Sequence, residues 1–497
     1  MSLLDTASLL LTPNAYKEDK LYSVIPSDGS GDFTFTRATS ATRVNAEGLI
    51  ETASVLGSEL VVNGDFATNS IWTTPTGWSI SNGTLQGTNA NAISATQSGF
   101  SFLNKSFKVE YTITEISQGG IIVFLGGVQS TPQRSAVGTY VEYIDITSGN
   151  STLYIYGINF TGKIDNVSVK EVITFNIPRL DYSNGTCPSL LVEPQRTNLA
   201  YPSIPNNYGN GTYTFNDAIS PDGTQNASSF VPSGNGLVYA NSLSTTAQTY
   251  TFSVYLKGTV NGQKVGLGDN NVILNTFTLT TSWQRYTFTF TGSVQTTAFY
   301  LLSGNYFSPA ENNKFYIWGA QLELGNYQTS YIPTTSASVT RNADVITKTG
   351  ISSLIGQTEG TVFWEGQVNG FGLYPQLFDL NADGNKFIQI YNDIVFGIPT
   401  IGIYVQNVSL LLSNPNIATI AYNTHFKFAL GYKNNDYVAY LNGVQVFTNT
   451  SIGVPPTSNF GLGDAAQGVS TSKKNVKATA LWKTRLTNDQ LAQLTTI

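Results

Sequence analysis

Alternation of apolar and polar residues with a period of two is the dominant pattern along this chain. Between residues 250 and 256, Tyr, Phe, Val and Leu alternate with Thr, Ser and Tyr, and residues 286–290 repeat the arrangement. This is the period of a half-buried β-strand. Such segments recur between clusters of Gly, Asn and Asp, which are typical of turns. The pattern predicts an all-β fold built from β-sandwiches, with almost no helix.

The C-terminal third contains the clearest turn signals. Residues 432–447 include Asn434-Asn435 and Asn442-Gly443. The second pair is the strongest short hairpin signal, because both residues tolerate positive φ. The stretch from Asp379 to Asn385 matches the first half of a calcium-binding loop. Ile390, however, occupies the position at which a bidentate Glu would complete the coordination of the ion. A plain hairpin is therefore the better interpretation of that stretch.

The last residues of the chain have a pattern typical of a short helix. Thr487 and Gln490 have the spacing of a capping box, in which each side chain bonds the backbone of the other residue. Leu491 and Leu494 then fall on the side of the helix that faces the core. This helix is an exception in a chain that otherwise favours strands.

Composition and charge limit the kinds of partner that the protein is expected to bind. Charged residues make up only 11% of the 497 residues and the formal net charge is −6, so nothing favours nucleic acid or an anionic membrane as partner. The apolar run near the N-terminus carries Asp5 and is too short and interrupted for a secretory signal or a membrane span. A chain of this length usually forms two to four domains, and a single cysteine cannot form an internal disulfide.

Enzyme chemistry finds little support in the residue types. His425 is the one histidine, which is poor material for a catalytic triad or a zinc site, and we expect a partly exposed residue at the start of a strand. Cys187 stands between Thr and Pro with no nearby base, so we expect it to be buried and inert. A carboxylate pair for glycoside hydrolysis stays open, because sequence gives no distances among 31 acidic residues. We predict that the protein is not an enzyme.

Three stretches resemble structural proteins of tailed bacteriophages. The first spans residues 178–198 and reads PRLDYSNGTCPSLLVEPQRTN, an irregular mixture of paired charges, prolines and a short apolar run. The second spans residues 33–51, FTFTRATSATRVNAEGLIE, and is similar to the block that normally lies just upstream. The third combines GAQLELG at 319–325 with TSYIPT at 329–334. Because a stretch of domain size separates the first two, we expect one adaptor that received an insertion and whose two blocks lie side by side.

The resemblances divide the chain into an irregular N-terminal adaptor and three sandwiches. The adaptor comprises residues 1–57 and continues at 173–200. The inserted sandwich, 58–172, and a second one, 201–337, are similar to jelly-roll carbohydrate-binding modules, and the third, 338–497, resembles concanavalin A-like (laminin-G-like) domains. The motifs that carry these similarities are LVVNGDF at 60–66, KIDNVSVKE at 163–171, FYIWGAQLELG at 315–325 and ALWKTRLTNDQLAQL at 480–494.

The carbohydrate-binding resemblance implies candidate sites on the inserted sandwich. Such jelly rolls often hold a structural calcium ion between the first and last strands; the matching positions here are Asp65 and Asp165, although Ala67 replaces the usual glutamate. No other cofactor is expected. Sugar rings stack on aromatic faces, and Trp72 and Trp78 flank a Thr-Thr-Pro-Thr-Gly loop. We expect Trp72 to be the more exposed of the two and Trp78 to be closer to the core, which we also expect to hold Trp283, Trp318, Trp364 and Trp482.

Paired charges are concentrated in the adaptor blocks of an otherwise charge-poor chain. The candidates for ion pairs or assembly contacts are Arg37, Arg43, Arg179, Asp181, Glu193 and Arg196. They either stiffen the adaptor within one chain or dock it on a neighbouring subunit, and the sequence does not choose between these roles. Exposed ion pairs contribute only about 0–1 kcal/mol, so the value of such pairs lies mainly in fixing geometry.

The resemblance implies a non-enzymatic structural protein of a tailed-phage virion, made in the host cytoplasm and carried on the particle as a tail or head fibre or decoration protein. Its lectin-like domains would attach to host or mucosal glycans, and its adaptor would bind other virion proteins. By analogy it would form a homo-oligomer, a trimer, with no nucleic-acid partner and no membrane insertion. The alternatives are a bacterial surface adhesin or carbohydrate-binding accessory protein, and a capsule depolymerase.

Overall fold

The computed structural model describes residues 2–239, 243–244, 246–269, 272–292, 296–297, 299–371, 376–395, 398–462 and 472–497. Within these residues the protein is all-β and consists of three β-sandwiches. The chain forms two compact units: residues 54–174, called here the inserted unit, and residues 1–53 with 175–497, called the composite unit. No helix in the described part of the chain is long and apolar enough to cross a membrane.

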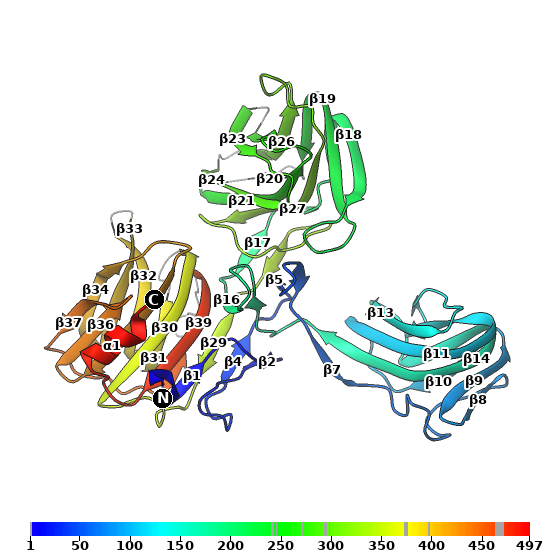
Figure 1. Ribbon diagram of the computed structural model, residues 1–497, viewed down its shortest axis with the longest axis horizontal. Helices are drawn as coiled ribbons and strands as arrows, with labels where there is room; N and C mark the ends of the chain where they lie inside the picture. The colour runs from blue at the N-terminus through cyan, green and yellow to red at the C-terminus, as the bar shows by residue number, and fades with distance from the viewer. Residues whose placement is uncertain are drawn as a thin grey trace. The chain divides into compact units, whose positions relative to one another are not determined.

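The inserted unit is a sandwich organised by two long antiparallel strands, β11 (Lys105–Leu125) and β14 (Thr152–Ile173) (Figure 1). Four irregularities in their register increase the local bend and twist of the pair. At one of them Gly119 has a φ of 73°, and a Cβ there would lie 2.2 Å from the carbonyl oxygen of Ile158. The remaining strands are β7 (Val55–Glu59), β8 (Trp78–Ser81), β9 (Thr84–Ala90), β10 (Ile93–Ser98), β12 (Gln129–Ser130) and β13 (Gly138–Ile146).

The first sandwich of the composite unit contains the strands expected from the alternating pattern. β21 (Thr249–Gly258) pairs with β24 (Gln284–Thr291), so that Tyr250 lies opposite Phe290. The main sheet has the order β23-β22-β26-β19-β27-β21-β24, with β18 paired to β19. Its other strands are β18 (Asn207–Ala218), β19 (Ala227–Tyr239), β22 (Lys264–Asp269), β23 (Val272–Thr278), β26 (Phe299–Gly304) and β27 (Phe315–Leu324); β20 (Leu243–Ser244) and β25 (Thr296–Thr297) pair separately.

The second sandwich of the composite unit, the C-terminal sandwich, packs two sheets around one apolar core. The first sheet has the order β15-β16-β39-β30-β35-β36-β37, and the second β2-β3-β4-β29-β38-β31-β32-β33-β34. The strands from the C-terminal third are β29 (Val345–Lys348), β30 (Glu359–Phe371), β31 (Gln376–Asp383), β32 (Lys386–Val395), β33 (Ile398–Asn407), β34 (Ser409–Thr419), β35 (His425–Lys433), β36 (Asp436–Leu441), β37 (Val444–Asn449), β38 (Asn459–Gly461) and β39 (Ser472–Trp482).

The local turn and helix predictions for this sandwich are confirmed. β31 and β32 form the plain hairpin, with Asp383 paired to Lys386. Between β36 and β37, Asn442 and Gly443 have φ values of 49° and 82°, as a two-residue hairpin turn requires. The helix α1 (Asn488–Thr495) begins after Thr487 with the expected capping box and buries Leu491 and Leu494.

Short segments of the expected adaptor are strands of the C-terminal sandwich. β1 (Leu9–Leu11) pairs with β39, and β4 (Phe33–Thr36) pairs with β29, so the N-terminal region contributes to both sheets (Figure 1). Leu9 and Phe33 lie in the same core as Trp364. The other adaptor strands in these two sheets are β2 (Tyr16–Lys17), β3 (Lys20–Leu21), β15 (Leu180–Asp181) and β16 (Ser189–Val192), and η1 (Leu3–Thr6) precedes β1.

Candidate functional site

The two phage-like blocks lie against each other in the composite unit. In the first block, β5 (Thr42–Val44) pairs with β6 (Ile50–Thr52). The amide of Val44 donates a hydrogen bond to the Asp181 carboxylate over 2.9 Å, and Arg179 donates to the carbonyl of Thr42 over 3.2 Å. The prediction that the blocks lie side by side is therefore confirmed.

A buried network of charges joins these blocks to a third segment. Arg37 donates to Asp344 over 2.7 Å, and Arg179 lies between Asp344 and Glu193, with 2.7 Å to the latter. Arg341 donates to Glu193 over 2.6 Å. The exposed fraction of each of these five side chains is 1% or less. We call these five residues the adaptor network.

The third phage-like stretch closes the adaptor network through Ser330. Its amide and its hydroxyl each donate to Glu193 over 2.7 Å. Beside it, the side chain of Asn198 donates to the carbonyl of Ile332 over 2.9 Å and accepts from the amide of Leu322 over 3.0 Å. β17 (Arg196–Asn198) also pairs with β28 (Val339–Arg341). All three stretches are thus bonded into one body.

Burial and mutual attraction set the proton affinities of the adaptor network. Burial opposes the charged form of Glu193, but the attraction of Arg341, Arg179 and Lys473 outweighs it and holds the pKa of the carboxyl well below its usual value. Burial also opposes the charge of Arg179, but Asp344 and Glu193 outweigh it and raise the Arg179 pKa. For Arg37, burial outweighs the attraction of Asp344 and lowers the pKa to about 10. All three groups are charged at neutral pH.

The six charged residues singled out in the sequence have different surroundings. Arg37, Arg179 and Glu193 belong to the adaptor network, whereas the other three lie outside it. Asp181 is buried and accepts from Val44 and Ser183, Arg43 pairs with the more exposed Glu51 over 2.9 Å, and the Arg196 guanidinium lies 5.0 Å from the ring centre of Tyr327. Arg341 and Asp344 were not among the residues singled out in the sequence. Their signal was two charges in a connector of a charge-poor chain, but only the fold brings them to Glu193.

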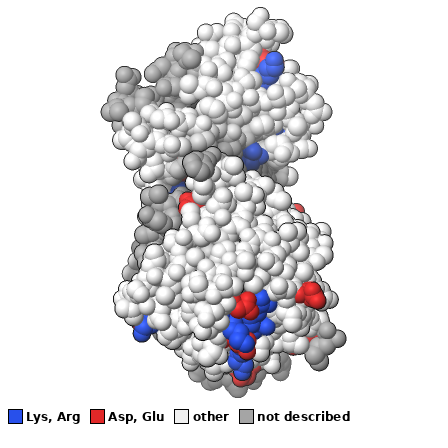
Figure 2. Space-filling model, turned by 90° about the vertical axis from the view of Figure 1, so that its left-hand side faces the viewer, with Lys and Arg blue, Asp and Glu red and all other residues white. Residues whose placement is uncertain are grey.

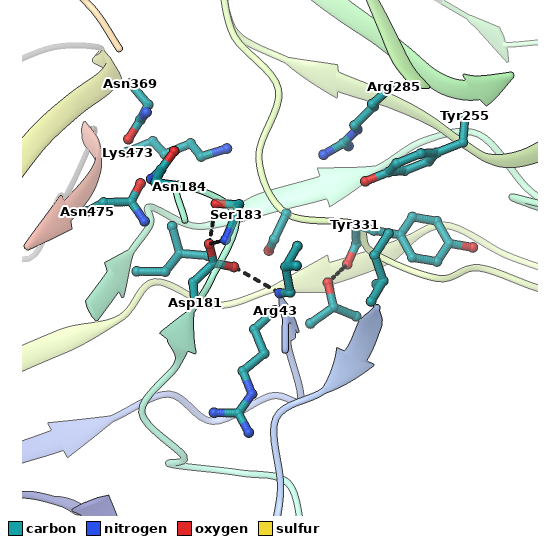
Figure 3. A pocket seen from close by; sticks show the side chains of 15 residues that line it. Arg43, Asp181, Ser183, Asn184, Tyr255, Arg285, Tyr331, Asn369, Lys473 and Asn475 are labelled. Atoms are coloured by element: carbon teal, nitrogen blue, oxygen red, sulfur yellow. Dashed lines mark hydrogen bonds between the residues drawn. The ribbon is translucent and has the colours of Figure 1, made fainter. Parts of the chain in front are cut away.

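A cavity of about 230 Å³ lies beside the adaptor network in the composite unit (Figure 3). Its walls come from both sandwiches and from both adaptor blocks. Arg285 and Tyr255 enter from β24 and β21, and Lys473 enters from β39. Figure 3 shows the Arg285 and Lys473 side chains directed into this space, whereas the Arg43 side chain points away from it. We call this cavity the junction pocket.

The two cations of the junction pocket are held differently. Arg285 donates to the carbonyl of Thr329 over 2.6 Å and to the hydroxyl of Ser253 over 2.9 Å. Lys473 makes longer contacts, 3.3 Å to the carbonyl of Gln328 and 3.7 Å to the carboxylate of Glu193. Burial lowers the pKa of Lys473, and the nearby charge of Arg285 lowers it further, although Glu193 acts in the opposite direction.

Trp72 is more exposed than Trp78 only by a small margin, and both indoles are buried. Trp72 is 7% exposed and its ring lies 5.3 Å from that of Phe66, with the indole N–H donating to the carbonyl of Asn63 over 3.0 Å. Trp78 is 5% exposed and stacks on Phe160. Both indoles belong to the core of the inserted unit, because the loop between them folds back onto the sheet. Neither ring presents a face on which a sugar could stack.

Replacing Trp72 by phenylalanine is expected to lower the stability of the inserted unit by about 1 kcal/mol, because the partly buried Asn63 carbonyl loses its donor. Urea unfolding of the inserted unit checks this value. The same variant is expected to bind glycans on an array as the unmodified protein does. Loss of glycan binding at unchanged stability would show that Trp72 contacts a sugar.

The two segments that carry the candidate calcium residues, Asp65 and Asp165, are hydrogen-bonded to each other. The amide of Val167 donates to the carbonyl of Gly64 over 2.9 Å. The Asp65 carboxylate accepts from the amide of Ala67, and Asp165 accepts from that of Asn166. Among the described residues, no group of three or more His, Cys, Asp or Glu side chains is placed to hold a metal ion. Structural calcium at this position remains a prediction.

Two further residue predictions have opposite outcomes. His425 is the first residue of β35, with a side chain 29% exposed and bonded to Glu365 over 2.9 Å, so that prediction is confirmed. Cys187 is exposed, which corrects the expectation of a buried thiol. It lies in the loop between β15 and β16, outside either strand, where its side chain has no core to enter.

The remaining tryptophans mostly occupy the core as expected. Trp318, Trp364 and Trp482 are buried. Trp283 is half-buried and donates from its indole N–H to the carbonyl of Ile219 over 2.9 Å.

Figure 2 shows a face of the molecule on which charged side chains are sparse and positive and negative side chains are mixed.

No family model matches the chain, and no curated protein matches it. Among solved structures, it is similar to domain 4 of AbnA, a GH43 extracellular arabinanase from Geobacillus stearothermophilus, at 14% identity and a TM-score of 0.27, covering 35% of this chain and 83% of that one. The CBM40 of a Ruminococcus gnavus sialidase is 15% identical with a TM-score of 0.24, covering 28% of this chain and 84% of that one.

The NanB sialidase of Streptococcus pneumoniae is 15% identical with a TM-score of 0.24, covering 29% of this chain. The chain spans only 25% of the length of that sialidase. The fold is established by the strand pairing and core contacts described above.

Proposed function

We propose that the protein is a non-enzymatic structural component of a tailed-phage virion, whose sandwiches are presented to host or mucosal glycans. The observation that carries this proposal is the adaptor network. Three stretches that resemble phage structural proteins, far apart in the sequence, are bonded into one body, because Arg179 donates to the carbonyl of Thr42 and Ser330 donates to Glu193. Three of the five residues of the adaptor network, Arg37, Arg179 and Glu193, thus lie in the stretches that carry the resemblance.

The role of the adaptor network is to give an otherwise irregular region a fixed shape. Buried charge pairs add little net stability compared with apolar residues, but they require one geometry. A particle protein needs a region of fixed shape to attach to other virion proteins. The glycan-binding part of the proposal is supported by the junction pocket, where amide, aromatic and charged side chains converge in a concave site.

Purified particles test the virion role. After density-gradient separation of a lysate, mass spectrometry is expected to find the chain with the DNA-filled particles. A variant without residues 54–174 is expected to remain with the particles, because the adaptor network lies entirely in the composite unit. Recovery of the full chain only from the soluble fraction, or from the cell envelope, would contradict the proposal; the envelope result would favour a surface adhesin.

The depolymerase alternative has its own test. Incubation of the purified protein with capsular polysaccharide is expected to release no new reducing ends. Sustained release would overturn the non-enzymatic assignment and would require a carboxylate pair at the separation used by glycoside hydrolases.

A further inference from the structure

We propose that the junction pocket binds a single sugar unit that carries a carboxylate, such as a uronic acid or a sialic acid. This inference deepens the proposed glycan-binding role and rests on it. The cavity of about 230 Å³ is below the range of roughly 300–1,000 Å³ for pockets that enclose drug-sized ligands. Its size therefore suits one ring at the end or side of a glycan.

Two cations provide the first half of the argument. Arg285 and Lys473 come from different sandwiches of the composite unit and both point into the junction pocket (Figure 3). Arg285 uses two of its N–H groups on Thr329 and Ser253, and a guanidinium has five. Within the described part of the chain, the Lys473 ammonium has contacts of 3.3 Å and 3.7 Å. A ligand carboxylate between them would accept charge-assisted hydrogen bonds from both and relieve their mutual repulsion.

The one carboxylate in the pocket wall does not replace such a ligand. Asp181 accepts from the amide of Val44 over 2.9 Å, from the amide of Ser183 over 3.0 Å, and from the Ser183 hydroxyl. Its oxygens are therefore largely occupied by these donors. Asp181 is therefore not placed to neutralise Arg285 and Lys473 in the way that a ligand carboxylate would.

Amide side chains provide the second half of the argument. Asn184, Asn369 and Asn475 line the same cavity and lie together in Figure 3. Asn369 Nδ2 donates to Asn423 over 3.0 Å, while its Oδ1 is buried with no hydrogen-bond partner among the described residues. An amide can donate to one hydroxyl and accept from its neighbour. Asn475 Nδ2 already donates to Ser189 over 2.9 Å, but the buried Oδ1 of Asn369 would accept a hydrogen bond from a sugar hydroxyl, so the combination favours an acidic sugar over phosphate.

Calorimetric titration of the full chain tests the ligand class. The probes are glucuronate and N-acetylneuraminate, with glucose as the neutral match, and inorganic phosphate and N-acetylglutamate as anions without the sugar hydroxyls. We expect at least one acidic sugar to bind about tenfold or more tightly than the three comparison compounds. Equal binding of glucose, of phosphate or of N-acetylglutamate, or no binding of either acidic sugar, would overturn the inference.

Matched variants locate the site. Arg285→Gln and Lys473→Met are each expected to weaken binding of the acidic sugar about tenfold or more, because each removes a charged donor. Lys433→Met is the control, since Lys433 lies on β35 of the same sandwich as Lys473 and makes an exposed pair with Glu359 over 3.6 Å. Unchanged thermal unfolding shows that each variant is folded. Unchanged binding in both pocket variants would place the sugar elsewhere and overturn the assignment.

Failure of this inference is distinguishable from failure of the virion proposal. A chain that is found with particles but binds no acidic sugar contradicts only the pocket assignment. A chain that binds an acidic sugar through Arg285 and Lys473 but is absent from particles supports the pocket and contradicts the virion role.

Discussion

Replacing Arg179 by methionine is expected to lower the free energy of unfolding of the composite unit by about 3–5 kcal/mol. Arg179 is fully buried between Glu193 and Asp344, so methionine would leave two buried carboxylates short of a partner. Arg37 would still pair with Asp344, and Arg341 would still pair with Glu193. Neither arginine can replace the bonds that Arg179 makes to both carboxylates. The loss should therefore be much larger than that of an exposed ion pair.

Hydrogen exchange measured by mass spectrometry separates the two units, because peptides report local opening along the chain. Peptides from the composite unit are expected to exchange faster in the Arg179→Met variant, whereas those from residues 54–174 should be unchanged. Arg43→Met is the matched control, since its pair with Glu51 is partly exposed and is worth about 0–1 kcal/mol. Equal effects of the two substitutions would mean that the adaptor network does not hold the unit together.

Phe33→Ala is expected to destabilise the C-terminal sandwich by about 3–5 kcal/mol, although residue 33 is more than 300 positions from most of that domain. Its side chain is fully buried, and its ring lies 5.6 Å from that of Phe460 on β38. Truncation leaves a cavity between the two sheets. The loss should appear as faster exchange in β29, β31 and β38.

Phe175→Ala provides the comparison for Phe33→Ala. Phe175 is 55% exposed, and its truncation should change stability by no more than about 0.5 kcal/mol. A loss as small as this for Phe33→Ala would show that the N-terminal region is dispensable for the C-terminal sandwich. A large and localised loss would show that this region is a structural part of it.

Sequence patterns were sufficient wherever structure depends on neighbouring residues. The alternation at 250–256 identified β21, Asn442-Gly443 identified a hairpin, and Thr487 with Gln490 identified the start of α1. Each of these signals depends on side chains within a few positions of one another. The all-β class followed from their repetition.

Features that depend on residues far apart in the chain were harder to predict from the sequence. β1 and β3 have only two or three residues, too few to show a period, and the pairing of β1 with β39 supplies the missing information. Trp72 follows a turn in which Ile71 has a positive φ of 75°, and this turn directs the indole inward. In the adaptor network, Asp344 meets Arg37 only after the chain has passed through two sandwiches.

The pairing of β1 with β39 has a consequence for the order of folding during synthesis. Leu9 lies opposite Leu481, so this contact cannot form until the ribosome has synthesised β39. The inserted unit closes through contacts within residues 54–174 and can fold while the ribosome is still at work. Contacts of such high contact order form slowly. β1 therefore pairs with β39 only after the two other sandwiches have been synthesised, and a product interrupted before β39 would leave Leu9 without its partner strand.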